Sequence, residues 1–251
     1  MSCLLLDAGN TRLKWALLDG PHWLAQGVCA YAELAGLPAQ LAPWPAVQRI
    51  LACNVAGPTV AEQLAACWPA LSISWLKSSA AQAGVRNGYL RPEQLGADRW
   101  AALIGARALR QTDLLVVMAG TAMTVDALSS TGEFLGGVIV PGFRLMREAL
   151  ARGTADLGLP DGATATFARS TGEAIVNGAL AALSGAIAQQ YAQLSAHSGH
   201  SAQILLSGGD AARIAPCLPP ALAAQLIRID NLVLHGLAQL AQRDSNQEAS
   251  A

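Results

Sequence analysis

Three short segments combine small residues with side chains that can bind phosphate or a metal: residues 7–14, 120–126 and 207–210. Each follows an apolar run typical of a buried strand. A glycine-containing turn at a strand end presents backbone N–H groups to an anion, and threonine or asparagine beside it adds donors. Asp7 is placed to hold Mg²⁺ directly or through water, while Lys14 supplies a positive charge for phosphate. The three segments together indicate a nucleotide-binding protein.

An ordinary hairpin is the alternative for the first segment. Gly9 and Asn10 can both take positive φ, and Gly-Asn is common in hairpin turns. If this were the only segment of its kind, an ordinary hairpin would explain it. Its recurrence after two further apolar strands favours phosphate binding.

The hydrophobic pattern predicts an α/β protein in which strands position these turns. Asp98 precedes a predicted helix, and a loop dense in Gly, Asn and Pro leads to it. Strands are expected over residues 3–8, 13–18, 47–53, 71–76, 114–118, 125–128, 134–140 and 203–206, and helices over 59–67, 99–110, 173–194 and 230–243, with one more starting near residue 144.

The two halves of the chain follow a similar plan, because each opens with a strand, a turn of small and hydroxylated residues, and a second strand. We therefore expect two similar α/β domains, residues 1–112 and 113–243, followed by a disordered tail over 244–251. A ligand is expected in the cleft between the domains, held by both turns.

Composition excludes several classes of protein. The chain has 251 residues, 53% hydrophobic and 13% charged, with a net charge of −1, which provides a core and no electrostatic footprint for nucleic acid. Five scattered cysteines indicate neither a disulfide framework nor a zinc site. The N-terminus lacks the features of a signal peptide. The uncharged stretch between Glu173 and Asp210 is interrupted by polar residues, so we interpret it as a buried or dimer-facing helix and expect a cytoplasmic protein without membrane partners.

Five motifs in order give the chain a specific resemblance. They are DAGNTRLK at residues 7–14, GADR at 96–99, GTAMTVD at 120–126, GGVIVPG at 136–142 and SGGD at 207–210. Together they resemble type III pantothenate kinase, a family in the superfamily of acetate kinase, sugar kinases and actin. The resemblance implies two ribonuclease H-like domains, usually in a homodimer. It also implies ATP- and Mg²⁺-dependent phosphorylation of pantothenate to 4′-phosphopantothenate, the first step toward coenzyme A.

The same resemblance assigns roles to individual residues, with Asp98 as general base. Pantothenate binding is implied for Tyr89, Gly96, Ala97, Asp98, Arg99 and Thr171. Contacts with ATP or its phosphates are implied for Asp7, Ala8, Gly9, Asn10, Thr11, Arg12, Leu13, Lys14, Gly120, Thr121, Ser207, Gly208 and Gly209.

Asp98 has the chemistry that a kinase base needs. Phosphoryl transfer passes through a loose transition state, and a carboxylate accepts the alcohol proton late. The dipole of the helix that follows should keep Asp98 ionised, although an aspartate before a helix is also an ordinary N-cap. Arg99 could bind the pantothenate carboxylate or neutralise transferring phosphate. Asp126 could approach Mg²⁺ or bond to the neighbouring turn.

Met118 departs from the family pattern. The second turn of the family begins with an aspartate associated with K⁺ or NH₄⁺, and a thioether is a poor ligand for a hard cation. We therefore expect weak or absent dependence on K⁺.

Two other functions remain open. A regulatory protein with a vestigial or sensing nucleotide cleft is one, because some relatives are described as accessory transcription factors. A kinase of the same superfamily acting on another small alcohol or carboxylate is the other.

Overall fold

The computed structural model describes residues 1–248 and divides into two compact units. Unit 1 comprises Met1–Gln111, Gly132–Phe134 and the segment from Asn231 onward, and unit 2 comprises Thr112–Thr131 and Leu135–Asp230. The chain first passes from unit 1 to unit 2 between Gln111 and Thr112, next to the predicted domain boundary at residue 112. The C-terminal segment belongs to unit 1 rather than to the second half.

Unit 1 is built on a five-stranded sheet in the order β3-β2-β1-β4-β5. β1 pairs antiparallel with β2 and parallel with β4. The strands of this sheet are β1 (Ser2–Ala8), β2 (Leu13–Asp19), β3 (His22–Cys29), β4 (Arg49–Asn54) and β5 (Ile73–Trp75). Two short strands, β6 (Ala81–Gln82) and β7 (Val85–Asn87), pair with each other instead, and β7 also pairs with Glu133 and Phe134. The helices are α1 (Leu37–Leu41), α2 (Pro58–Cys67), α3 (Ala97–Leu109) and α8 (Leu232–Glu248), with 3-10 turns at Tyr31–Gly36 and Pro92–Gln94.

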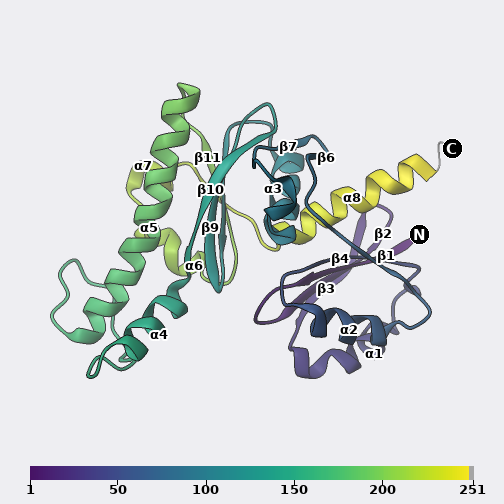
Figure 1. Ribbon diagram of the computed structural model, residues 1–251, viewed down its shortest axis with the longest axis horizontal. Helices are drawn as coiled ribbons and strands as arrows, with labels where there is room; N and C mark the ends of the chain where they lie inside the picture. The colour runs from purple at the N-terminus through teal and green to yellow at the C-terminus, as the bar shows by residue number, and fades with distance from the viewer. Residues whose placement is uncertain (249–251) are drawn as a thin grey trace. The chain divides into compact units, whose positions relative to one another are not determined.

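Helices cover both faces of this sheet, which explains the continuous apolar run in β1. Leu4 and Leu6 belong to a core with residues of α1 and α2, whereas α8 packs against β1, β2, β4 and α3 on the other side (Figure 1). Each fully buried leucine contributes about 2 kcal/mol. A Cβ at Gly236 of α8 would lie 1.9 Å from the backbone oxygen of Ala101 in α3. This close approach fixes α3, and with it Asp98 in the first turn of the helix.

Unit 2 repeats the strand order of unit 1. Its strands run β12-β11-β8-β9-β10, and the sheet continues with β7 and β6, where β7 pairs with Glu133 and Phe134, the part of β10 that belongs to unit 1. Counted from β8, the first strand of unit 2, the order is 5-4-1-2-3, which is the order of unit 1 read from its other edge. β8 pairs antiparallel with β9 and parallel with β11. The elements are β8 (Leu114–Ala119), β9 (Ala122–Leu128), β10 (Glu133–Pro141), β11 (Gln203–Ser207), β12 (Leu226–Arg228), α4 (Phe143–Gly153), α5 (Thr171–Ser198), α6 (Ala211–Ile214) and α7 (Pro220–Ala223), with a 3-10 turn at Ala215–Cys217.

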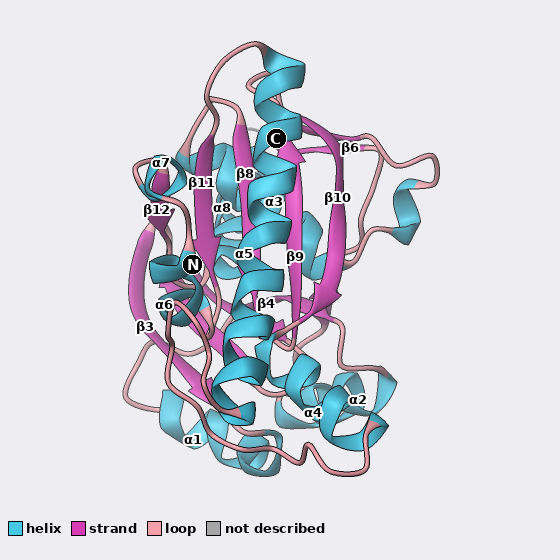
Figure 2. Cartoon of the chain, turned by 90° about the vertical axis from the view of Figure 1, so that its left-hand side faces the viewer, coloured by secondary structure: helices cyan, strands magenta, loops and turns pink. Residues whose placement is uncertain are grey.

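The long helix α5 runs across the sheet of unit 2 in front of β8 and β9 (Figure 2). Its residues Val176, Leu180, Leu183 and Ile187 lie in the core of the unit. By length and composition α5 could also cross a membrane, and 44% of its most apolar stretch is buried. Core helices of soluble proteins share these features, so the helix is weak evidence for a membrane span.

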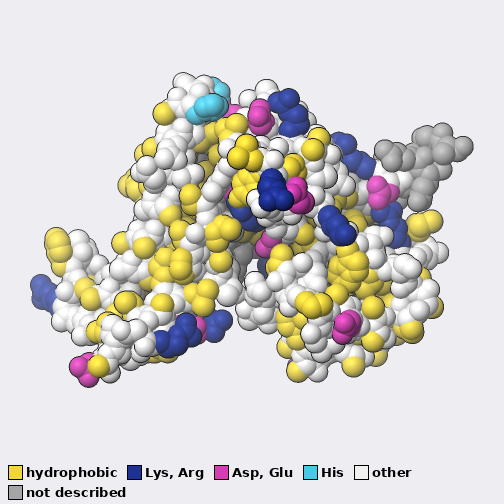
Figure 3. All heavy atoms as spheres, viewed as in Figure 1, with side chains coloured by type: hydrophobic (Ala, Val, Ile, Leu, Met, Phe, Trp, Pro, Cys, Tyr) yellow, Lys and Arg dark blue, Asp and Glu magenta, His cyan; other side chains and the backbone are white. Residues whose placement is uncertain are grey.

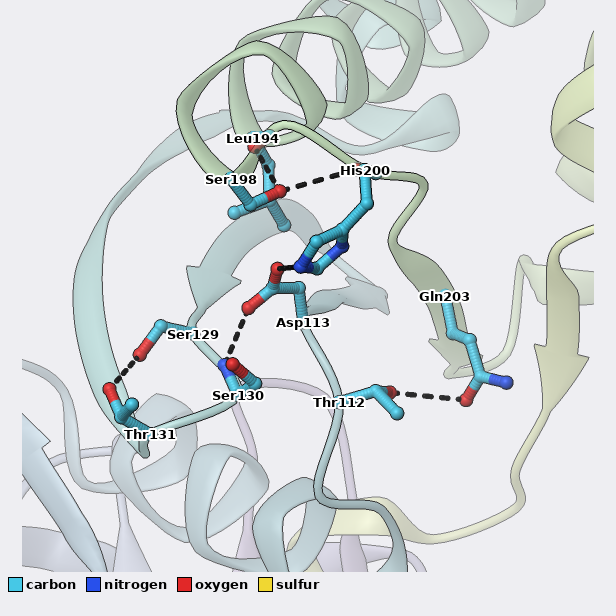
Figure 4. A network of polar contacts seen from close by, with 9 residues as sticks. All are labelled: Thr112, Asp113, Ser129, Ser130, Thr131, Leu194, Ser198, His200 and Gln203. Carbon is cyan, nitrogen blue, oxygen red and sulfur yellow. Dashed lines mark hydrogen bonds and ion pairs between the residues drawn. The ribbon is translucent and has the colours of Figure 1, made fainter.

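A polar network ties the end of α5 to the start of β8 (Figure 4). Asp113 is 3% exposed and accepts a hydrogen bond of 2.5 Å from the backbone N–H of Ser130. Its other carboxylate oxygen lies 3.2 Å from Nε2 of His200. Ser198, the last residue of α5, donates to the carbonyl of Leu194 at 3.0 Å. The buried carboxylate is thus held from two separate segments.

The predicted elements are found with shifted ends, and several elements were missed. β3 follows β2 after a two-residue turn, and β7 and a 3-10 turn interrupt the stretch before Asp98 that was expected to be a loop. β12 and three short helices were also missed. The disordered tail predicted over 244–251 is wrong for residues 244–248, which continue α8 to Glu248. Residues 249–251 lie outside the described part of the chain.

Candidate active site

Asp7 lies near the end of β1 between two neighbouring strands. It pairs with Lys14 across β2 and with Cys53 across β4. The Cys53 thiol is fully buried and donates to Oδ1 of Asp7 at 3.4 Å. Burial raises the pKa of Asp7 to about 6, opposed by the charge of Lys14. The sheet register therefore brings a carboxylate and a lysine to the strand end, as the sequence predicted.

The turn from Gly9 to Arg12 is held by a residue that the motif does not include. Tyr31, at the start of a 3-10 turn, donates its hydroxyl to the carbonyl of Gly9. Burial raises the pKa of Tyr31 to about 12, so the hydroxyl stays a donor. Neither Gly9 nor Asn10 takes positive φ, so this turn does not use the hairpin conformation considered for it.

Asp98 lies inside the first turn of α3. The helix begins at Ala97 after the N-cap Gly96, two residues earlier than predicted, so Asp98 is not the N-cap. Its Oδ1 accepts a hydrogen bond from the backbone N–H of Arg99 at 2.8 Å. Burial raises the pKa of Asp98, opposed by that hydrogen bond and by the charge of Arg99. Desolvation is the largest of these effects on the pKa of Asp98, and it depends on burial that the sequence alone did not show.

Asp98 also lies close enough to Asp7 for the two charges to interact, which raises the pKa of Asp7. The first phosphate loop and the candidate base therefore share one neighbourhood in unit 1. Two neighbouring negative charges disfavour ionisation of both Asp7 and Asp98. A cation bound beside these two carboxylates would therefore be favoured.

Arg99 and Tyr89 are in direct contact. Arg99 is 5% exposed, and its guanidinium donates to the Tyr89 hydroxyl at 2.9 Å. Asn87 organises the loop that carries Tyr89, since its side chain accepts from the Tyr89 N–H at 3.0 Å and donates to Ser78 and to the carbonyl of Pro92. The signal that could have found Asn87 is its place in a loop rich in turn residues.

Two turns meet at the end of β8 in unit 2. Gly208, at φ +109°, passes so close to Ala119 that a Cβ would lie 2.2 Å from the carbonyl oxygen of Ala119. The N–H of Asp210 donates to the same oxygen at 3.1 Å. Thr121 lies beside this strand end, and its carbonyl accepts from the N–H of Gly142 at 2.9 Å. The residues predicted to contact phosphate and adenosine in this half therefore come from adjacent backbone.

Met118 occupies the position in unit 2 that Asp7 occupies in unit 1. It pairs with Thr124 on one side and Ser207 on the other. The hydroxyl oxygen of Thr124 is buried without a hydrogen-bond partner in the described part of the chain. Asp126 is completely buried, and its carboxylate lies against Gly137 of β10. This burial favours the structural role of the two considered for Asp126.

Thr171 is the first residue of α5 and is exposed. The preceding Ser170 caps the helix by accepting from the N–H of Glu173 at 3.3 Å. Thr171 belongs to unit 2, whereas Tyr89 and the 96–99 segment belong to unit 1. In the described part of the chain, no group of three or more His, Cys, Asp or Glu side chains could hold a metal ion.

The repeated strand order defines the class of this protein, two ribonuclease H-like α/β domains. Solved structures with this fold include a putative Baf family transcriptional activator from Campylobacter jejuni, with a TM-score of 0.61, 19% identity and coverage of 97% of this chain and 99% of that one. A putative 2-dehydro-3-deoxygalactonokinase from Sinorhizobium meliloti gives a TM-score of 0.60 at 16% identity, over 96% and 98% of the two chains. At these identities the likeness shows the fold alone.

Sequence comparison identifies the family. The family model of type III pantothenate kinase matches residues 3–193. The type III pantothenate kinase of Aromatoleum aromaticum is 46% identical over 96% of this chain and 98% of its own length. That of Dechloromonas aromatica is 45% identical over 94% and 97%. The chain belongs to the type III pantothenate kinase family.

Proposed function

We propose that the chain transfers the γ-phosphoryl group of ATP to the primary hydroxyl of pantothenate, giving 4′-phosphopantothenate. The observation that carries this proposal is the match of the chain to type III pantothenate kinases over nearly its full length. Unit 1 contributes the phosphate-loop carboxylate Asp7 and the helix-borne carboxylate Asp98, whose charges interact. Asp7 is assigned to the nucleotide phosphates, and Asp98 is assigned to the alcohol that is phosphorylated.

Asp98 acts as the general base. Its carboxylate accepts the proton of the pantothenate hydroxyl late in a loose transition state. The hydrogen bond from the Arg99 N–H fixes the carboxylate orientation. Because burial raises its pKa, Asp98 is a stronger base than an exposed aspartate.

Asp7 fits the expected Mg²⁺. A carboxylate oxygen is the ligand that Mg²⁺ prefers, and the ion is commonly held by one or two carboxylates and substrate phosphates while retaining waters. When bound, Mg²⁺ neutralises charge on the β- and γ-phosphate oxygens. Lys14, opposite Asp7 in the sheet, adds a second positive charge. We assign the metal to Asp7 and give Asp126 a structural role because of its burial.

The remaining assignments follow the family motifs. Residues 7–14 bind phosphates in unit 1, and in unit 2 Gly120 and Thr121 bind phosphate while residues 207–209 face adenosine. Tyr89, residues 96–99 and Thr171 bind pantothenate. The contact between Arg99 and Tyr89 supports the pairing of these two residues in one substrate site.

The monovalent-cation site of the family is impaired here. Met118 offers sulfur where K⁺ or NH₄⁺ requires oxygen. The hydroxyls of Thr124 and Ser207 flank it in the sheet but carry no charge. We propose that catalysis depends weakly on K⁺.

We further propose a cytoplasmic homodimer that binds neither nucleic acid nor membranes. The side of α5 turned away from its core exposes small uncharged residues, among them Ala174, Gly178, Ala181 and Gly185, which suits a helix covered by a second copy. On the face shown in Figure 3, Lys and Arg side chains form small separate groups, unlike the basic stripe of a nucleic-acid-binding protein. Sedimentation of Ala181→Glu against the unaltered protein tests the dimer, and a variant that stays dimeric would move the interface elsewhere.

ADP release with ATP, Mg²⁺ and pantothenate tests the activity, alongside Asp98→Asn. Pantothenate-dependent turnover that the substitution abolishes is the expected result. If Asp98→Asn left turnover intact, Asp98 would not be the general base, whereas the assignment of kinase activity would stand. Turnover with another small alcohol instead would favour the second kinase hypothesis, and a folded protein with no turnover would favour the regulatory role.

A further inference from the structure

Phe134 lies beside Arg99, although none of the motifs includes it. It is the second residue of β10 and belongs to unit 1, where it pairs in parallel with Asn87 of β7. Its side chain is completely buried. Asn87 is the residue that organises the loop carrying Tyr89. The short β7–β10 pairing therefore places Phe134 next to the contact between Tyr89 and Arg99.

The guanidinium of Arg99 is packed against two aromatic rings. Its Cζ lies 5.7 Å from the ring centre of Phe134 and 5.6 Å from that of Tyr89. The two rings are themselves 5.2 Å apart and tilted by 42°. Tyr89 adds a hydrogen bond to the guanidinium through its hydroxyl. Phe134 offers a ring face and no polar atom.

This arrangement restricts a side chain that is otherwise among the most flexible in proteins. A guanidinium within about 6 Å of an aromatic ring centre is attracted by the negative face of the ring. Arg99 is almost fully removed from water, so these contacts also offset part of its lost hydration. A guanidinium held in one plane recognises a carboxylate through two parallel hydrogen bonds, which a mobile one does less well.

We propose that Phe134 is a positioning residue that orients Arg99 to bind the carboxylate of pantothenate. This inference rests on the proposed function and chooses between the two roles considered for Arg99. Phe134 itself does not touch the substrate in this assignment. It acts through Arg99, and its effect is therefore confined to substrates that carry the carboxylate.

The test compares two substrates in Phe134→Leu. One is pantothenate, and the other is its primary amide, in which the carboxylate is replaced by an uncharged group. We expect kcat/KM for pantothenate, divided by kcat/KM for the amide, to fall about tenfold in the variant, as the loss of a desolvated cation–π contact suggests. KM for ATP should stay within about twofold of the unaltered protein. Equal losses with both substrates, or no loss, would overturn the proposal.

Phe143→Leu in unit 2 is the matched control. Phe143 is also a buried phenylalanine with arginines over its ring, Arg147 at 5.4 Å and Arg213 at 4.4 Å. The substrate ratio should not change in this control. Should Phe134→Leu fail to fold, Phe134→Met is judged by the same ratio, because its unbranched side chain adapts better to an irregular space and also lacks a ring.

A double variant tests whether Phe134 acts through Arg99. In the background of Arg99→Lys, which has already lost the planar guanidinium, Phe134→Leu should change the substrate ratio little further. If the two substitutions instead lowered the substrate ratio independently, so that their effects multiplied, the proposal would be contradicted. Absence of pantothenate turnover in the unaltered protein would instead be a failure of the proposed function, so the two failures can be told apart.

Discussion

The carboxylate of Asp98 occupies the space beside Gly96 that any larger residue would need. A Cβ at Gly96 would lie 2.7 Å from Oδ1 of Asp98, which is the oxygen that accepts the hydrogen bond from the Arg99 N–H. The glycine of the GADR motif thus gives the proposed base room to fold back over the start of α3.

Gly96→Ala should displace this carboxylate while the fold persists. The end of a short side chain can move, so we expect little loss of thermal stability and a fall in kcat of about tenfold or more, since small misplacements of a catalytic group are costly. Steady-state kinetics and a thermal melt measure both quantities. Gly36→Ala is the control, because a Cβ there meets nothing within 4 Å. Unchanged kcat in Gly96→Ala would show that the orientation of Asp98 is unimportant.

Asp7 should make stability depend on pH. Burial raises its pKa from 3.8 to about 6, so between these values the folded state retains a proton that the unfolded state has released. The free energy of unfolding therefore falls as pH rises through this window, and the cost is complete above about pH 6. Asp7→Asn should stabilise the protein by up to about 3 kcal/mol at pH 7.5 and change it little near pH 4.

Urea unfolding without Mg²⁺ at both pH values measures this effect. Asp19→Asn provides the comparison, since the Asp19 side chain is half exposed and its removal should have a small effect. A loss of stability in Asp7→Asn at pH 7.5 would mean that Lys14 and Cys53 more than offset the desolvation of the carboxylate.

Tyr31→Phe should loosen the first phosphate loop by removing the hydroxyl that binds the Gly9 carbonyl. The ring remains, so the core keeps its packing. We expect a several-fold rise in KM for ATP, KM for pantothenate unchanged, and a cost of about 1 kcal/mol in stability. Initial rates with each substrate varied in turn make the distinction. Equal changes in both KM values would indicate a general loss of structure instead.

Met118→Asp should introduce dependence on K⁺. The substitution places a carboxylate at the strand position equivalent to Asp7, beside the Thr124 hydroxyl, which is buried without a hydrogen-bond partner among the described residues. We expect the unaltered protein to work nearly equally in K⁺ and Na⁺, and the variant to be faster in K⁺. Met118→Leu serves as the control without a new ligand. A collapse of the unaltered protein in Na⁺ would show that the cation site works without an aspartate.

Asp113→Ala should destabilise unit 2 more than His200→Ala. Asp113 is buried and its removal leaves the N–H of Ser130 without this acceptor, whereas the His200 side chain is 60% exposed. We expect a loss of about 1–3 kcal/mol for the former and less than about 1 kcal/mol for the latter. Thermal melts of the two variants side by side provide the comparison. A larger effect of His200→Ala would place the stabilising contact in the ion pair.

Local patterns in the sequence predicted much of the fold. The apolar runs of β1 and β8 are long, buried on both faces and followed by turn residues, so their strands could be read directly. β12 and β7 have three residues each, too few to show a period, and β3 alternates weakly because several of its residues are exposed. The placement of α8 on the sheet of unit 1 depends on contacts between the two ends of the chain, which no local pattern contains.

The functional site was likewise predicted only in part from the sequence. Residue types and spacing predicted the phosphate-binding turns and revealed the family resemblance, and the resemblance in turn implied the proposed base, because all of these depend on short motifs. The tertiary structure decided which groups surround them. Cys53, Tyr31 and Phe134 reach Asp7, Gly9 and Arg99 across sheet registers and turns that join distant segments. It also decided that burial governs the pKa of Asp98, since desolvation depends on everything packed around a carboxylate and not on its neighbours in sequence.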